Sequence, residues 1–218
     1  MPIPPRSAHG PTSDPAADPG PRLCVVTGGA GCGKSTAVRL IAGALPEAGR
    51  FDADACVHQL LTEPLVRDKV VGALGDSMVA ADGLVDRARL RKLVLADPDS
   101  RVKLEQLLHP MVADALLQQL AAGTSPWLVA EVPLFYESAC DFPSDLVIAV
   151  AASPIIQRTR LQARGLKDAE IDALLEAQWP VDRKMRHADT CLWNDGPLSA
   201  LESQIALLAA GPPFQHHS

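Results

Sequence analysis

A glycine-rich segment at residues 28–36 constrains this chain more than any other feature. It reads Gly-Gly-Ala-Gly-Cys-Gly-Lys-Ser-Thr, a complete G-x-x-x-x-G-K-[ST] phosphate-binding loop, and it follows an apolar run at residues 23–26. Such a loop needs a buried strand before it and an amphipathic helix after it. Val38, Ile41 and Leu45 recur at helical spacing after the loop. The segment therefore predicts a strand, a phosphate-binding loop and a helix in succession.

The loop carries the groups that a polyphosphate requires. Its glycines let the backbone approach an anion closely, so that successive N–H groups can point at phosphates, and the helix that begins near Lys34 adds its positive dipole end. Lys34 supplies a charge for the β- and γ-phosphates, and the Ser35 hydroxyl suits a Mg²⁺ ion bound through the nucleotide. A simple glycine-rich turn is the alternative. The predicted nucleotide-binding set is Gly29, Gly31, Cys32, Gly33, Lys34, Ser35 and Thr36.

Length and composition restrict the class of protein further. At 218 residues the chain suits one core with insertions, and its net charge of −6 argues against broad affinity for nucleic acid or membrane surfaces. No apolar stretch approaches the roughly 18 residues that span a bilayer. The 5 cysteines show no C-x-x-C spacing, which indicates neither a disulfide framework nor a zinc site. We expect a cytoplasmic protein without nucleic-acid or membrane partners.

Both ends of the chain are predicted to be poorly ordered. Residues 1–21 are rich in proline, lack the apolar segment of a secretory signal, and are expected to form a disordered tail. Use of that tail for tethering or partner binding is the alternative. Residues 208–218 are expected to be frayed, and the His216-His217 pair is too short to indicate metal binding.

Between the ends, short apolar runs alternate with helical patterns. Strands are predicted at residues 22–27, 50–52, 127–132, 145–151 and 190–193. This alternation is typical of a parallel sheet covered by helices on both faces. We therefore predict an α/β fold in which a five-stranded, mostly parallel sheet is flanked by helices, with a single domain over residues 22–207.

Two helical insertions are predicted within this domain. In the first, at about residues 55–125, Asp86 and Asp97 can cap helices, and His109-Pro110 should break or kink the path. An insertion beyond the strand ends is where an acceptor-substrate pocket is expected. The second, at about residues 155–187, is rich in arginine and lysine. It suits a closing lid that neutralises a transferring phosphoryl group, and a solvated helical hairpin is the alternative.

Several motifs, in order, resemble those of the dephospho-coenzyme A kinase family, P-loop kinases that phosphorylate the ribose 3′-hydroxyl of dephospho-coenzyme A in the last step of coenzyme A synthesis. Residues 27–36 are similar to T-G-G-I-G-S-G-K-S-T, residues 52–54 with His58 to D-A-D and a basic residue, and residues 132–137 to V-P-L-L-F-E. Further matches lie at residues 82–91, 104–110, 160–164, Gln178, 188–189 and Asn194. The resemblance spans about residues 22–207 and implies a P-loop kinase fold.

Three residues depart from the family pattern. Cys32 replaces the usual Ser, and Glu131 stands where Asp is frequent before V-P-L. Lys167 occupies the place where Ser or Thr would cap the lid helix, so we expect the cap to shift to Asp168. Cys32 also lies within a ring of backbone N–H groups, which would stabilise a thiolate and favour alkylation that ATP prevents. Selection of a small residue for fit is the alternative for Cys32.

The resemblance implies catalytic roles for four residues. Asp52, at the end of the second strand, is the candidate that orients the 3′-hydroxyl and accepts its proton. Lys34 holds the phosphates, and Arg160 or Arg164 from the lid meets the transition-state charge; their i, i+4 spacing lets both reach one anion. Structural roles, including surface salt bridges for the arginines, are the alternatives. Asp54 is a candidate for acceptor binding, or for capping the next helix.

The remaining site residues are assigned by the same resemblance. Pro133, Leu134 and Glu137 are expected to face the acceptor, with a surface position as the alternative for Glu137. His109 lines the acceptor pocket or is a buried histidine with backbone partners. Asn194 matches the segment near the adenine of ATP, although an Asn in a turn would look identical.

Taken together, the residues and the resemblance predict an ATP:dephospho-coenzyme A 3′-phosphotransferase. It would use ATP with Mg²⁺ as co-substrate, hold no tightly bound organic cofactor, and act as a monomer or weak homo-oligomer. Another small-metabolite or nucleoside kinase on the same scaffold is one alternative, and a nucleotide-sensing module without turnover is another. A GTPase is disfavoured because the sequence lacks an N-K-x-D motif.

Overall fold

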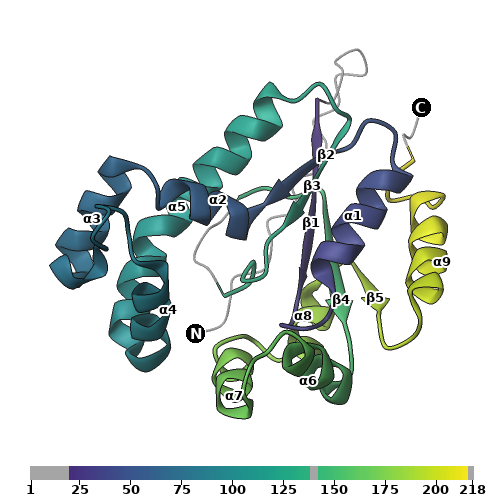
Figure 1. Cartoon of the computed structure of the whole chain (residues 1–218). Coiled ribbons are helices and arrows are strands. Elements are labelled where there is room, and N and C mark those ends of the chain that lie inside the picture. The colour runs from purple at the N-terminus through teal and green to yellow at the C-terminus, as the bar shows by residue number, and fades with distance from the viewer. Residues whose placement is uncertain (1–19, 138–141, 216–218) are drawn as a thin grey trace.

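A parallel sheet forms the centre of the molecule (Figure 1). The computed structural model of the chain describes residues 20–137 and 142–215. The strands are β1 (Arg22–Gly28), β2 (Gly49–Asp52), β3 (Trp127–Glu131), β4 (Leu146–Ala151) and β5 (Thr190–Trp193). They run in the order β2-β3-β1-β4-β5, and every pairing is parallel. The predicted five-stranded α/β fold is confirmed, with a sheet that is parallel throughout.

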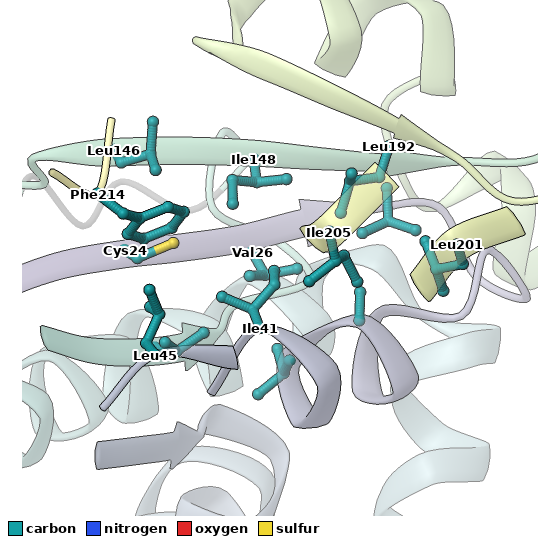
Figure 2. Packing of buried hydrophobic residues seen from close by; sticks show 14 of the residues in the cluster. Cys24, Val26, Ile41, Leu45, Leu146, Ile148, Leu192, Leu201, Ile205 and Phe214 are labelled. Atoms are coloured by element: carbon teal, nitrogen blue, oxygen red, sulfur yellow. The ribbon is translucent and has the colours of Figure 1, made fainter. Parts of the chain in front are cut away.

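Helices cover both faces of the sheet. On one face lie α1 (Lys34–Ala44) and α9 (Leu198–Ala209), where Val26, Ile41 and Ile205 meet in a cluster of buried apolar side chains (Figure 2). On the other face, Leu116 of the long helix α5 (Pro98–Ala122) packs with Leu23 and Val25. Successive residues of β1 thus enter different cores, which explains why the strand is almost continuously apolar.

The first insertion forms a small helical layer with its own core. It consists of α2 (Ala53–Leu60), α3 (Pro64–Leu74), a 3₁₀ turn (Asp76–Met78), α4 (Arg87–Ala96) and α5. Val66, Val70, Leu90 and Leu108 are buried together inside this layer. Helix α2 follows β2 directly and packs against α5, and this packing holds the start of α2 at the edge of the sheet.

Two predicted caps in this insertion are confirmed. Of the break or kink predicted at His109-Pro110, the break does not occur. Asp86 accepts a hydrogen bond from the Arg89 N–H at 3.0 Å, and Asp97 accepts one from the Ser100 N–H at 3.1 Å. Helix α5 does not end at Pro110 but continues through it to Ala122. Leu108 and Leu116, on the two sides of this proline, are both buried, and the gain from their burial exceeds the cost of one lost backbone hydrogen bond.

The second insertion contains three short helices, α6 (Pro154–Ala163), α7 (Asp168–Glu176) and α8 (Val181–His187). They lie together beyond the carboxyl end of the sheet, where the phosphate-binding loop leads into α1 (Figure 1). Ile171 and Leu161 pack on Ala30 of the phosphate-binding loop. The predicted shift of the α7 cap to Asp168 is wrong, because Lys167 is the N-cap and the Glu170 carboxylate accepts its N–H at 2.9 Å.

The C-terminal segment is packed rather than frayed up to residue 215. Helix α9 extends to Ala209, and Phe214 is buried with its ring edge-on to Trp127 at 4.9 Å between centroids. The prediction of fraying from residue 208 was therefore wrong for residues 208–215, because one aromatic anchor offsets the short length of the segment. Residues 216–218, and residues 1–19 of the tail predicted at 1–21, lie outside the described residues. In the part of the chain that the structure describes, no helix is both long and apolar enough to cross a membrane.

Candidate active site

The phosphate-binding loop joins β1 to α1 and is shaped by glycines that no other residue can replace. Gly31 and Gly33 have φ angles of 76° and 92°, in the left-handed region. A Cβ atom on Gly31 would lie 2.7 Å from the backbone oxygen of Gln157, and one on Gly33 would lie 2.4 Å from the Asn194 Nδ2 atom. The loop thus requires glycine both for its backbone conformation and for its close neighbours.

Two polar side chains donate hydrogen bonds to backbone carbonyl oxygens of this loop. Arg160 of α6 donates to the carbonyl oxygens of Gly31 and Cys32 at 3.3 and 3.4 Å, and Asn194 donates to the Cys32 oxygen at 2.8 Å. Arg160 also donates to the backbone oxygen of Asn194 at 2.8 Å. Because these carbonyls are bound by protein donors, the loop is fixed in shape before a ligand arrives.

Lys34 and Ser35 begin helix α1 and face the end of β3. Lys34 Nζ donates to the Gly29 oxygen at 3.1 Å, and burial lowers the pKa of this amine. Ser35 Oγ donates to Glu131 Oε1 at 3.0 Å, and burial raises the pKa of the Glu131 carboxyl. The site therefore holds a buried cation, a hydroxyl and a carboxylate beside the phosphate-binding loop.

Glu131 is a site residue that sequence reasoning noted only as a departure. It is the last residue of β3, pairs in register with Val26 of β1, and is 8% exposed. The available signal was its position, since an acid at the end of the strand beside the loop strand holds magnesium in other P-loop enzymes. Hard oxygen donors of this kind, with the Ser35 hydroxyl, suit Mg²⁺.

Asp52 and Asp54 bring two more carboxylates to this edge. Asp52 lies opposite Glu131 in the pairing of β2 with β3, as expected for the end of the second strand. Its Oδ1 atom accepts the Ala55 N–H at 3.0 Å, so Asp52 caps α2, and the suggestion that Asp54 caps this helix is wrong. Burial and the Asp52 charge raise the pKa of Asp54, while the charges of Lys34 and His58 oppose that shift. The positive charge of Lys34 therefore acts on the Asp54 carboxylate.

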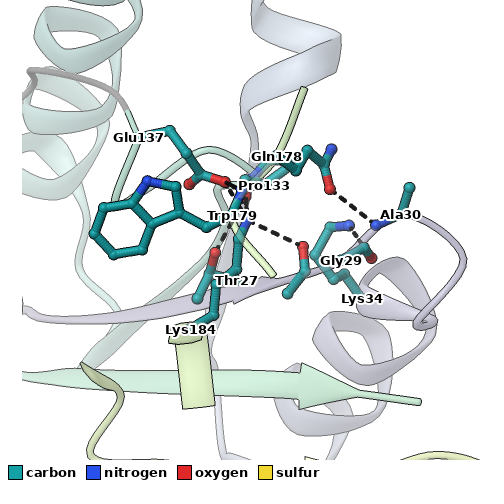
Figure 3. A network of polar contacts seen from close by, with 10 residues as sticks. Thr27, Gly29, Ala30, Lys34, Pro133, Glu137, Gln178, Trp179 and Lys184 are labelled. Atoms are coloured by element: carbon teal, nitrogen blue, oxygen red, sulfur yellow. Dashed lines mark hydrogen bonds and ion pairs between the residues drawn. The ribbon is translucent and has the colours of Figure 1, made fainter. Parts of the chain in front are cut away.

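A buried ion pair connects the loop after β3 with the second insertion (Figure 3). Lys184 of α8 is fully buried, and its Nζ atom lies 2.8 Å from Glu137 Oε1 and 2.6 Å from the Pro133 oxygen. The same Glu137 oxygen accepts the Trp179 N–H at 2.8 Å, while Thr27 Oγ1 donates to the Pro133 oxygen at 3.2 Å. A surface position for Glu137 is thus wrong, and Lys184 is a central residue that sequence reasoning counted only as one of many lid charges.

Residues of the second insertion also contact the phosphate-binding loop itself. Gln178, one of the residues matched to the family pattern, accepts the Ala30 N–H at 3.0 Å through its side-chain oxygen. Lys184 Nζ also lies 3.5 Å from the Gly28 oxygen. The link between α7 and α8 and the side chain of Lys184 therefore contact the phosphate-binding loop.

Cys32 does not have the environment expected for a reactive thiolate. Its side chain is fully buried, and burial raises the pKa of the thiol, an effect that the positive charges of Lys34 and Arg160 only oppose. The expectation of a stabilised thiolate is wrong because desolvation exceeds the effect of nearby positive charges. The alternative, a small residue chosen for fit, agrees with this burial.

The other predicted site residues differ in how closely they approach this cluster. Arg164 is exposed at the end of α6, and its side chain has no hydrogen-bond or ion-pair partner among the described residues. Pro133 and Leu134 lie in the turn after β3, half-buried. His109 is half-buried within α5, where burial lowers its pKa. Asn194 contacts the phosphate-binding loop directly, and an adenine contact stays a prediction.

The fold and this constellation define a P-loop kinase, because a parallel sheet carries a G-K-S loop, three neighbouring carboxylates and an arginine-bearing insertion at its carboxyl edge. Solved structures support that class. The chain aligns with a dephospho-CoA kinase from Campylobacter jejuni (TM-score 0.60, 23% identity, 86% of this chain and 95% of the other) and with a shikimate kinase from Acinetobacter baumannii (TM-score 0.54, 14% identity, 87% and 93%). These two likenesses concern the fold.

The family follows from the sequence comparison. The dephospho-CoA kinase family model matches residues 22–200, and the chain belongs to this family. A dephospho-CoA kinase from Thiobacillus denitrificans is 37% identical over 189 residues, covering 84% of this chain and 91% of the relative. One from Bradyrhizobium diazoefficiens is 35% identical over 198 residues, covering 87% and 94%. The structure of TT1252 from Thermus thermophilus has a TM-score of 0.73 and 29% identity, covering 88% and 98%. The predicted family is confirmed.

Proposed function

We propose that this protein transfers the γ-phosphoryl group of ATP to the ribose 3′-hydroxyl of dephospho-coenzyme A. The observation that carries the proposal is the placement of Asp52 opposite Glu131, with Asp54 at the start of α2 within range of the Lys34 charge. A carboxylate at this edge can orient a hydroxyl next to a phosphate that the loop holds. Family membership supports the choice of acceptor.

The loop residues bind and align the nucleotide. Backbone N–H groups of the loop and the start of α1 receive the β- and γ-phosphates, and Lys34 exchanges its contact with the Gly29 oxygen for phosphate oxygens. Ser35 and Glu131 would hold Mg²⁺ together with the nucleotide. When bound, this ion neutralises charge on the phosphates. We propose no other cofactor.

Asp52 acts on the acceptor. Its second carboxylate oxygen is not used in capping α2, and it can accept a hydrogen bond from the 3′-hydroxyl. The proton of that hydroxyl passes to Asp52 as the oxygen attacks phosphorus and the bond to the leaving ADP breaks. Arg160 and Arg164 neutralise the transferring group. Arg160 already lies against the loop through the Gly31 oxygen, whereas Arg164 must move inward from its exposed position.

The test is the Asp52→Asn variant, assayed for ADP release with dephospho-coenzyme A. Asparagine keeps the acceptor oxygen that caps α2 but cannot take a proton, so kcat should fall about 10²- to 10⁴-fold with ATP affinity unchanged. Asp114→Asn, an exposed change on α5, is the matched control and should behave like the wild type. A variant at position 52 with wild-type kcat would refute the role of Asp52.

Two alternatives make different predictions in the same assays. Another metabolite kinase would turn over shikimate, gluconate or a nucleoside faster than dephospho-coenzyme A. A nucleotide sensor would bind ATP without turnover of any acceptor, and Asp52→Asn would then change nothing. We also propose that the protein acts in the cytoplasm, as a monomer or weak homo-oligomer, in agreement with its free cysteines and acidic charge.

A further inference from the structure

Two basic side chains of the helical insertion touch each other one helical turn beyond Asp54 on α2. Arg87, the first residue of α4, places Nη2 2.5 Å from Nε2 and 3.2 Å from Nδ1 of His58 on α2. Both side chains are exposed. A guanidinium only donates hydrogen bonds, so the imidazole must be neutral to accept one. The pair therefore carries a positive charge whichever form His58 takes.

This charge has no counterion in the described part of the chain. The carboxylate next to Arg87 in sequence, Asp86, is committed elsewhere, since it accepts the Arg89 N–H at 3.0 Å and pairs with Arg89 Nε at 3.0 Å. The Asp54 carboxylate, one helical turn before His58, senses the His58 charge but forms no ion pair with it among the described residues. An exposed cation without a fixed partner can bind an anionic ligand without breaking an existing contact.

Helix α2 sets the distance between this pair and the proposed phosphoryl acceptor position. Asp54 and His58 are four residues apart, so they lie on one face of α2, about 5–6 Å from each other between Cβ atoms. The acidic end of that face is within range of the Lys34 charge, and the basic end contacts Arg87. In a nucleoside 5′-diphosphate, the 3′-hydroxyl and the first phosphorus are separated by only a few bonds across the ribose.

We propose that Arg87 and His58 form a subsite for the 5′-diphosphate of the acceptor, while the acidic end of α2 receives its ribose 3′-hydroxyl. This inference rests on the proposed function and adds the basis of acceptor choice. A nucleoside without a diphosphate would leave the basic pair unused and bind more weakly. Charge-assisted hydrogen bonds from arginine to phosphate supply the discrimination.

The experiment measures KM for dephospho-coenzyme A and for ATP in Arg87→Gln. We expect KM for dephospho-coenzyme A to rise about 10- to 100-fold, with KM for ATP within twofold of the wild type. Lys92→Gln is the matched control, because it removes an exposed charge from the same helix and should leave both constants unchanged. Adenosine, as a competitor of dephospho-coenzyme A at saturating ATP, should inhibit wild type and Arg87→Gln equally.

A second variant separates binding of the diphosphate from a structural role of the contact. His58→Gln breaks the link between α2 and α4 but keeps the Arg87 charge, so its KM should rise less than that of Arg87→Gln. Equal losses in both variants, or a parallel rise in KM for ATP, would overturn the inference. If the wild type turns over dephospho-coenzyme A and Arg87→Gln matches Lys92→Gln, the subsite is wrong and the proposed function stands. If the wild type does not phosphorylate dephospho-coenzyme A, the proposed function fails and the subsite with it.

Discussion

The two halves of the candidate site are built in opposite ways. On the phosphate side, Lys34, Glu131 and Lys184 are buried, and each is hydrogen-bonded to neighbouring protein groups. On the acceptor side, Asp52, His58 and Arg87 are exposed. The phosphate side is thus preorganised within the folded chain, whereas the acceptor side stays solvated until a substrate covers it.

This difference has a physical reason in the chemistry proposed. Stabilisation of charge that develops on a transferring phosphoryl group is most effective when the dipoles and charges are fixed in advance. A bulky acceptor must instead enter and leave, and its own surface can complete the burial of the acidic and basic groups on α2. The free energy of substrate binding then offsets the cost of desolvating those groups. An acceptor whose charges complement them is therefore favoured over one that lacks such charges.

The largest expected effect lies at the buried pair of the phosphate side. Lys184→Met leaves the Glu137 carboxylate without its cation, and removal of one partner of a buried ion pair typically costs about 3–5 kcal/mol of unfolding free energy. Urea denaturation measures this loss. The double variant Lys184→Met/Glu137→Gln should recover much of it, since no unpaired charge is left in the interior. Lys69→Met, an exposed change on α3, is the control and should stay within about 0.5 kcal/mol of the wild type.

The double variant also tests what the buried pair does for activity. If Lys184 positions the turn after β3 against the phosphate-binding loop, a well-folded double variant should still show lower kcat and higher KM values. Full recovery of kcat together with stability would show that the pair acts on stability alone, and would weaken the contrast between the two halves of the site.

The fold could be predicted from the sequence because its signals are local. Apolar runs such as 23–26 and the capping residues Asp86 and Asp97 depend on neighbours within a few positions, and the structure confirms them. A break or kink was predicted at Pro110, and no break occurs there because burial along α5 depends on distant helices. Local secondary-structure propensity is overridden wherever tertiary packing contributes more free energy.

The site was predictable only where a motif marks it. The residues of the phosphate-binding loop were found directly, but Lys184 was not distinguished from Arg183 and Arg186 in the same basic run. Lys184 is buried and its neighbours are exposed, because its partners Gly28 and Glu137 are 156 and 47 positions away in the chain. Contacts of that range leave no periodic signal in one sequence.

An intermediate effect is expected where the phosphate-binding loop is tightest. Gly33→Ala forces a side chain into a backbone with φ of 92° and places its Cβ atom 2.4 Å from Asn194 Nδ2. Strain of this kind costs about 1–3 kcal/mol, and Asn194 must release the Cys32 oxygen. Titration calorimetry with an ATP analogue should show weaker binding.

Gly43→Ala is the matched control for this substitution. Gly43 lies within α1 with nothing within 4 Å of its added Cβ, so alanine should leave nucleotide affinity intact and raise stability by up to about 1 kcal/mol. Equal nucleotide affinities in the two variants would show that the loop tolerates a side chain, contrary to a preorganised phosphate side.

The smallest effect on stability is expected on the acceptor side. Arg87→Gln removes an exposed charge whose one contact is a like-charged or neutral imidazole, so the free energy of unfolding should change by less than about 0.5 kcal/mol in urea titrations. A loss above about 1 kcal/mol would mean that Arg87 supports the packing of α2 on α4. The start of α4 would then be part of the packed structure, and the contrast between a buried phosphate side and an open acceptor side would not hold for Arg87. A rise in KM for the acceptor could no longer be assigned to the lost charge alone.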